Sequence, residues 1–87
     1  MKIKVKAAPH KKESIAISTE FIQLQAFLKF VGIAETGGHA KELINDRLIR
    51  VNGEVCLARG KKLREGDVVT AFGTDYTVVS ENHYENS

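Results

Sequence analysis

Apolar residues change their spacing along the chain, and each change marks a different kind of element. Residues 14–18 alternate apolar with small or polar side chains, which predicts a short strand. Between residues 22 and 31 the apolar positions recur three and four apart, the spacing of a helix with one buried face. That face consists of Leu24, Phe27, Leu28 and Val31. Gly32 follows where helices commonly end on a left-handed residue.

A second helix is predicted from about His39 to Asp46, directly after the pair Gly37-Gly38. Its buried face consists of Ala40, Leu43 and Ile44, and its outward face of Lys41, Glu42 and Asn45.

The remainder of the chain is typical of short strands joined by turns. The strand 48–51 leads into Asn52-Gly53, the strongest short hairpin signal in the sequence. In this strand Ile49 and Val51 face inward, so Arg50 is expected to face outward. Further strands are predicted at 68–72 and 76–79, with turns at 64–67 and 73–75 and a basic loop or bulged strand at 58–62. A strand, two helices and then three or four antiparallel strands predict a small α+β domain.

The length of 87 residues allows one small domain and excludes a multi-domain enzyme. We expect the folded domain at 14–80, a flexible basic arm at 1–13 (an edge strand is the alternative) and a disordered acidic tail at 81–87. No apolar run approaches the roughly 20 residues that cross a bilayer, and no secretory leader is recognisable. Cys56 is the only cysteine and cannot form an internal disulfide, so we expect a reducing, cytoplasmic setting.

Charge is unevenly distributed along the chain, although the net charge is only +2. Residues 37–64 hold seven basic and three acidic side chains, whereas 65–87 hold five acidic side chains and no lysine or arginine. This segregation is expected of a polyanion-binding face with an acidic back. Two solvated charge patches without a partner are the alternative.

The sequence shows no pattern of catalysis or metal binding. His10, His39 and His83 lie far apart, and there is no HExxH, CxxC or phosphate-loop motif. Cys56 falls on a predicted strand, which favours a small buried core residue over a nucleophile. We therefore expect no enzyme activity, no metal and no cofactor.

Two segments could bind phosphate. Glycines before a helix leave backbone N–H groups uncovered at its positive end, and Lys41 and Asn45 follow Gly37-Gly38 on one outward face. A tight link between helices is the alternative explanation of these glycines. The second segment, 59–64, is basic and includes Gly60. No Phe or Tyr is interleaved with its bases, which disfavours a stacking platform for single strands and favours contacts with the phosphates of folded RNA.

Several short runs together resemble the S4 RNA-binding domain. They are Leu24–Leu28, Gly32–Ala34, Ala40–Ile44, Ile49–Gly53 and Gly66–Val68. The resemblance covers roughly residues 15–79. Gly37–Lys41 together with Arg59–Leu63 is most similar to the small stand-alone bacterial S4 proteins of the YaaA-like type.

The resemblance implies an S4-type (αL) domain, with two helices packed on a small twisted antiparallel sheet of about four to five strands. It also implies that the helix pair lies against structured RNA. Carried over by position, the RNA-binding residues are Gly37, Gly38, His39, Lys41, Asn45, Arg50, Asn52, Arg59, Lys61 and Lys62.

The chain departs from the S4 pattern at three places. Gln23 stands where many S4 domains have an arginine, and Thr36-Gly37 stands where many have Ser-Arg. Backbone amides or Lys41 must then replace the missing arginine contact. Arg47 stands where a glycine commonly ends the second helix, so we expect either a positive φ or a longer helix there.

The sequence favours a monomeric, non-catalytic protein that binds structured RNA, with ribosomal RNA or a ribosome assembly particle as the expected partner. A protein-interaction adaptor that uses the same charged face is the alternative. We do not expect a β-grasp sulfur carrier, because that class needs a C-terminal Gly-Gly and this sequence reads Asn86-Ser87 there.

Overall fold

The computed structural model describes residues 11–81 and contains two helices and seven strands. The strands are β1 (Lys11–Ile17), β2 (Ile22–Gln23), β3 (Arg50–Val51), β4 (Glu54–Val55), β5 (Lys62–Leu63), β6 (Val68–Ala71) and β7 (Thr74–Ser80). The helices are α1 (Leu24–Phe30) and α2 (Gly37–Asn45). None of the described helices is long and apolar enough to cross a membrane.

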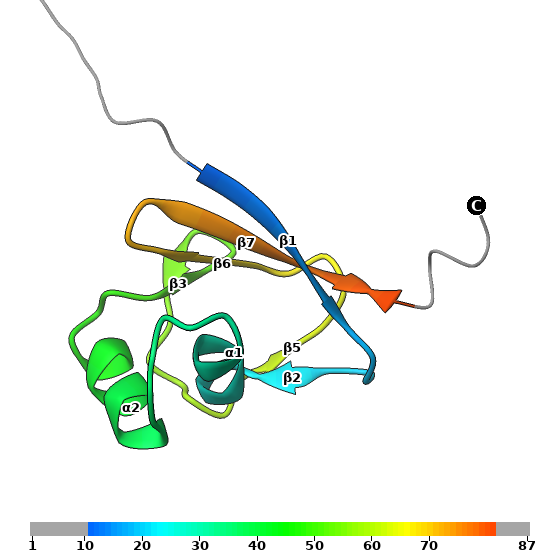
Figure 1. The fold of residues 1–87 in the computed structure, drawn as a ribbon. Coiled ribbons are helices and arrows are strands. Elements are labelled where there is room, and N and C mark those ends of the chain that lie inside the picture. Colours follow the sequence, from blue (N-terminus) through cyan, green and yellow to red (C-terminus); the bar gives the residue numbers. More distant parts are fainter. Residues whose placement is uncertain (1–10, 82–87) are drawn as a thin grey trace, which may run out of the picture.

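The strands form a five-stranded sheet in the order β1-β7-β6-β3-β4 and a separate ribbon of β2 and β5. The helix pair and the small twisted sheet confirm the predicted S4-type arrangement, but the large sheet is mixed and not wholly antiparallel. β1 pairs with β7 in parallel, with Lys11 opposite Thr74 and Ile17 opposite Ser80 (Figure 1). Parallel strands need a long connection between them, and here both helices and the intervening strands supply it.

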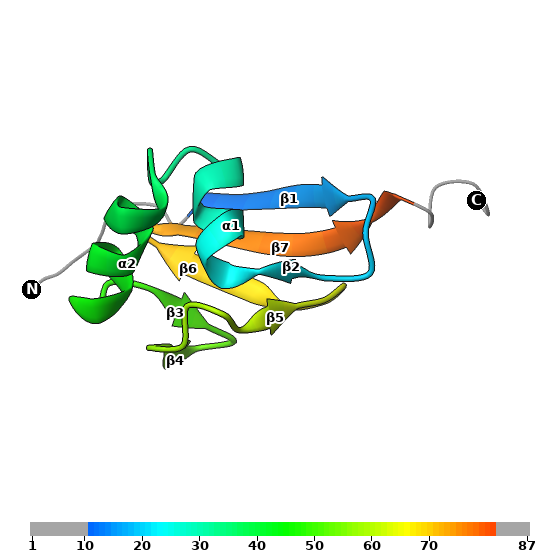
Figure 2. The same ribbon diagram turned by 90° about the horizontal axis from the view of Figure 1, so that it is seen from below.

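Both helices lie on one side of the large sheet, and the core forms between them and the sheet (Figures 1 and 2). The predicted helix faces supply much of it, since Leu24, Phe27 and Leu28 from α1 are fully buried. The sheet contributes Val51, Val69, Ala71 and Val78, all buried. The rings of Phe27 and Tyr76 meet edge to face with their centroids 6.3 Å apart, joining α1 to β7.

Three turns have the predicted backbone. Asn52 and Gly53 both have positive φ, 53° and 89°, as a type I′ hairpin requires, and they join β3 to β4. Gly32 ends the first helical segment with φ 86°. Arg47 adopts φ 64° just after α2, which confirms the expected positive φ at a position where the family commonly has glycine.

Several predicted boundaries were wrong. β1 begins at Lys11, so 11–13 form part of an edge strand, which is the alternative given for the arm. The first helix begins at Leu24 because the two preceding residues pair with β5. The second begins at Gly37, two residues early, because Thr36 caps it. Cys56 is half-buried and follows β4, so it is not a strand residue. The rest of the predicted arm (1–10) and nearly all of the predicted tail (82–87) lie outside the described residues.

Candidate nucleic-acid interface

The start of α2 leaves backbone donors available. The side chain of Thr36 accepts a hydrogen bond from the His39 backbone N–H at 3.0 Å, and its carbonyl accepts from Ala40 at 3.0 Å. Among residues 11–81, the N–H groups of Gly37 and Gly38 find no acceptor. An anion near this helix end would therefore meet two free amides and the positive end of the helix dipole.

The His39 ring adds a third donor at the same place. Its Nδ1 accepts a hydrogen bond from the Glu35 backbone N–H at 3.2 Å. In the neutral ring the proton must then sit on Nε2, so the free nitrogen of the ring is a donor. The start of α2 thus offers N–H groups from both backbone and side chain.

Glycine is not required by the fold at two of the predicted contact positions, Gly37 and Gly38, or at Gly60 of the basic segment. Four glycines have positive φ and serve turns: Gly32, Gly53, Gly66 and Gly73. Gly37, Gly38 and Gly60 do not. A Cβ at Gly37 or Gly60 would meet nothing within 4 Å, and one at Gly38 would make an ordinary 3.8 Å contact with the Thr36 hydroxyl. Neither backbone strain nor crowding explains these three glycines.

The exposed side of α2 carries Lys41 and Asn45 one helical turn apart, as predicted. Ala40, Leu43 and Ile44 are buried on its other side. Lys41 takes part in no ion pair among residues 11–81. Its ammonium is therefore available to an external anion.

The segment between β4 and β5 holds its backbone inward and its basic side chains outward. The carbonyls of Arg59 and Lys61 accept hydrogen bonds from the first backbone N–H groups of α1, at 3.0 Å from Gln25 and 2.8 Å from Leu24. The side chains of Arg59 and Lys61 are exposed and form no ion pair with any described residue. Because these carbonyls occupy the α1 end, α2 is the helix whose amino end stays open.

Figure 1 places α2 and the β4–β5 segment on the side of the molecule away from the large sheet, and Figure 2 looks onto that side. The structure thus brings the predicted residues of α2 and of 59–62 to one side of the fold.

Two predicted residues, Arg50 and Asn52, are set apart from that side. Arg50 is exposed between the buried Ile49 and Val51, as expected, which turns it to the face of the large sheet opposite the helices. Its Nη1 donates to the carbonyl of Gly53 at 3.3 Å. The contact predicted for Arg50 stays a prediction, but it would belong to a different face.

Both the nitrogen and the oxygen of the Asn52 side-chain amide are hydrogen-bonded within the fold. Its Nδ2 donates to Asp67 Oδ1 at 3.1 Å, and its Oδ1 accepts from the Val68 backbone N–H at 3.0 Å. The other Asp67 oxygen accepts from the Arg64 backbone N–H at 2.8 Å. The side chain of Asn52 therefore links the β3–β4 hairpin to the turn before β6, whether or not it also contacts RNA.

The Asp67 carboxylate is stabilised within this network. Partial burial raises the pKa of this carboxyl. Hydrogen bonds from the Arg64 backbone and the Asn52 amide lower the pKa, as do the positive charges of Lys61 and Arg64, and together they outweigh the effect of burial. The net result is a pKa below the ordinary value of 3.8.

An aromatic ring lies among the basic side chains, contrary to the expectation from the sequence. Lys62 Nζ lies 4.9 Å from the centroid of the Phe21 ring, and Arg64 Cζ lies 5.5 Å from it. Phe21 directly precedes β2, the strand that pairs with β5, so no local run of sequence reveals its place among the bases. The sequence could have indicated this contact only through the pairing of two short apolar segments, one around Ile22 and one around Leu63.

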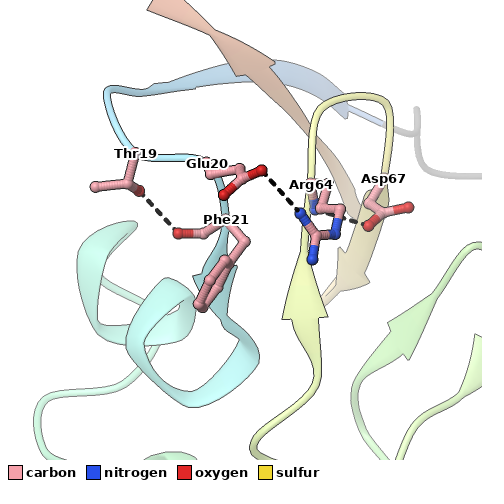
Figure 3. Close-up of polar contacts among 5 residues, drawn as sticks. All are labelled: Thr19, Glu20, Phe21, Arg64 and Asp67. Atoms are coloured by element: carbon pink, nitrogen blue, oxygen red, sulfur yellow. Dashed lines mark hydrogen bonds and ion pairs between the residues drawn. The ribbon is translucent and has the colours of Figure 1, made fainter.

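Arg64 also borders a cleft of about 400 Å³. It is lined by residues 17–20, Arg64, Glu65 and Ser80. Arg64 Nη1 lies 3.9 Å from Glu20 Oε2 across it (Figure 3). Among residues 11–81 there is no cluster of three or more histidine, cysteine, aspartate or glutamate side chains that could hold a metal ion.

Comparison with known proteins agrees with this architecture. The family model described as the S4 domain matches residues 15–79. A relative from Bacillus subtilis (strain 168), named "Probable ribosome maturation protein RlbA", is 42% identical over 59 residues, which cover 68% of this chain and 83% of the relative. The resemblance found in the sequence is confirmed: this chain belongs to the S4 domain family of RNA-binding domains.

Proposed function

We propose that this protein binds the phosphates of structured RNA through one surface, which we call the α2 surface. It consists of Gly37, Gly38, His39, Lys41, Asn45, Arg59, Gly60, Lys61 and Lys62. Its chemistry is backbone and imidazole N–H groups at the start of α2 together with cations from α2 and the β4–β5 segment. Such groups recognise the shape and charge of an RNA backbone and not its base sequence.

One observation carries the proposal. The three glycines that the fold does not need, Gly37, Gly38 and Gly60, are the three that lie in the α2 surface. An absent Cβ lets a phosphate approach the backbone closely, which is a reason for glycine that does not depend on folding.

Ribosomal RNA, or a ribosome assembly intermediate, is the partner that we propose. The support is the name of the Bacillus subtilis relative, a probable ribosome maturation protein. We further propose that the protein acts as a monomer in the cytoplasm, and that it holds RNA without transforming it. Two acidic side chains near the basic segment already have partners within the fold, which supports a role without catalysis. Asp67 accepts hydrogen bonds from Asn52 and from the Arg64 backbone, and Glu20 forms an ion pair with Arg64.

Titration against a ribosomal RNA helix at several salt concentrations tests the proposal. If the α2 surface neutralises about four or five phosphates, log K should fall with log [salt] with a slope of roughly −3 to −5. Replacing Lys41 and Lys61 together by alanine should make that slope shallower by about 2. Lys12→Ala is the matched control. Lys12 is an exposed lysine on β1, and β1 and β4 form the two opposite edges of the large sheet.

The proposal fails if the wild-type protein does not bind RNA at low salt, or if the double variant binds as well as the control. A protein partner that stays bound after nuclease treatment, together with absent RNA binding, would instead favour the adaptor function.

A further inference from the structure

The outward face of the β2–β5 ribbon carries an aromatic ring with two cationic side chains over it. Ile22 pairs with Leu63, which is fully buried, and Gln23 pairs with Lys62. Continuing this register places Phe21 opposite Arg64, with both side chains on the face opposite Leu63. The Phe21 ring is half-buried and lies within 4.9 Å of Lys62 Nζ and 5.5 Å of Arg64 Cζ. We call Phe21, Lys62 and Arg64 the ribbon platform.

The bend between β1 and β2, directly before the ring, is closed by a hydrogen bond of its own. The Thr19 hydroxyl donates to the Phe21 carbonyl at 2.8 Å, and Arg64 is anchored by its backbone N–H to Asp67 (Figure 3). The backbone on both sides of the platform is therefore fixed, while the Arg64 side chain stays 54% exposed and its ion pair with Glu20 is long, at 3.9 Å. A ligand can displace an exposed pair of that length at little cost.

The cleft beside the platform is large enough for part of a nucleotide. Its volume of about 400 Å³ falls within the usual range of roughly 300–1,000 Å³ for small-molecule sites. Arg64 lines the cleft and also lies over the ring, so this one side chain links the two. Lys62 belongs to both the platform and the α2 surface, so the two adjoin along the chain.

We propose that the ribbon platform binds one unpaired nucleotide of the RNA, with its base stacked on Phe21 and its flanking phosphates on Lys62 and Arg64. A base inside a double helix offers no free face to a ring, whereas an unpaired base does. A free anion would gain nothing from the aromatic ring, and a methylated amine would need a cage of several rings. This inference rests on the proposed function and names the RNA feature that it requires, a loop, bulge or single-stranded end beside a helix.

Phe21→Trp supplies a direct reporter, because the chain contains no tryptophan. Stacking of a base on the indole should quench its fluorescence. We expect quenching by hexauridine and by an RNA duplex with a single-stranded extension, and none by the same duplex with blunt ends.

Affinity provides the second readout. Phe21→Leu, which keeps an apolar side chain, should weaken binding of the extended duplex by about tenfold and leave the blunt duplex unchanged. Phe30→Leu is the matched control, since Phe30 is 61% exposed at the last residue of α1 and lies outside the platform. It should bind both duplexes as the wild type does.

The outcomes separate the two proposals. If the blunt duplex binds but neither hexauridine nor the extension quenches Phe21→Trp, the platform proposal is wrong and the α2 surface stands. If hexauridine quenches the indole while the blunt duplex does not bind, the platform stands and the α2 surface fails. The Phe21→Trp readout also decides the matter should Phe21→Leu fold poorly.

Discussion

Replacing Asn52 separates two contributions that this residue makes to stability. Its amide makes hydrogen bonds with Asp67 and with the Val68 backbone, and its backbone sits at φ 53° in the β3–β4 turn. Asn52→Gly removes the hydrogen bonds but suits the positive φ. Asn52→Ala removes the same bonds and adds the strain of a Cβ in the left-handed region.

The expected losses follow from these contacts. Two solvent-exposed hydrogen bonds contribute about 1–2 kcal/mol together, which is the expected loss for Asn52→Gly. The left-handed backbone adds about 1 kcal/mol for alanine, so Asn52→Ala should lose about 2–3 kcal/mol. In a domain of this size that loss lowers Tm by roughly 10–20 °C.

Urea unfolding followed by circular dichroism measures both variants against the wild type. Glycine should be the more stable of the two by about 1 kcal/mol. The reasoning is refuted if alanine is as stable as the wild type, or if glycine is the less stable variant. RNA affinity of the folded Asn52→Gly protein then tests the RNA contact that the family resemblance implies for this residue, separately from its structural role.

Three further predictions concern single residues. The pKa of Asp67 in the folded protein lies below 3.8, so the ionised carboxylate stabilises the fold above pH 3.8 and this stabilisation is lost as the pH falls below that value. The difference in unfolding free energy between wild type and Asp67→Asn should therefore shrink as the pH falls below 3.8. Gly37→Ala should raise stability by about 0.5–1 kcal/mol, since a Cβ there meets nothing, yet weaken RNA binding; equal or tighter binding in a titration contradicts the role given to this glycine. Arg47→Gly should raise stability in urea unfolding by about 0.5–1 kcal/mol, because it relieves φ 64°.

Local patterns predicted the parts of the fold that depend on near neighbours. The helical spacing of Leu24, Phe27 and Leu28 identified side chains that are fully buried. Asn52-Gly53 specified a hairpin turn because few residues accept two successive positive φ angles. The outward direction of Arg50 followed from the alternation of a strand.

Pairing between distant segments could not be predicted in the same way. The parallel partner of β1 lies at the other end of the described chain, and nothing in Lys11–Ile17 specifies β7 as its neighbour. The β2–β5 ribbon has only two residues in each strand, too few for a periodic signal. The contact of Phe21 with the basic side chains was missed for this reason, since Phe21 reaches them only through that ribbon.

The amino ends of the two helices differ in how many of their backbone N–H groups are hydrogen-bonded within the fold. At α1, the carbonyls of Arg59 and Lys61 satisfy the first amides, so the segment that carries the cations is itself held by the helix. At α2, Thr36 satisfies only the later amides and leaves those of Gly37 and Gly38 open. One helix end thus positions the basic side chains, and the other has the open donors that the proposed function assigns to phosphates. On this argument, Arg59→Ala should keep the support given to α1, because that support comes from the main chain, and should lose only affinity for RNA.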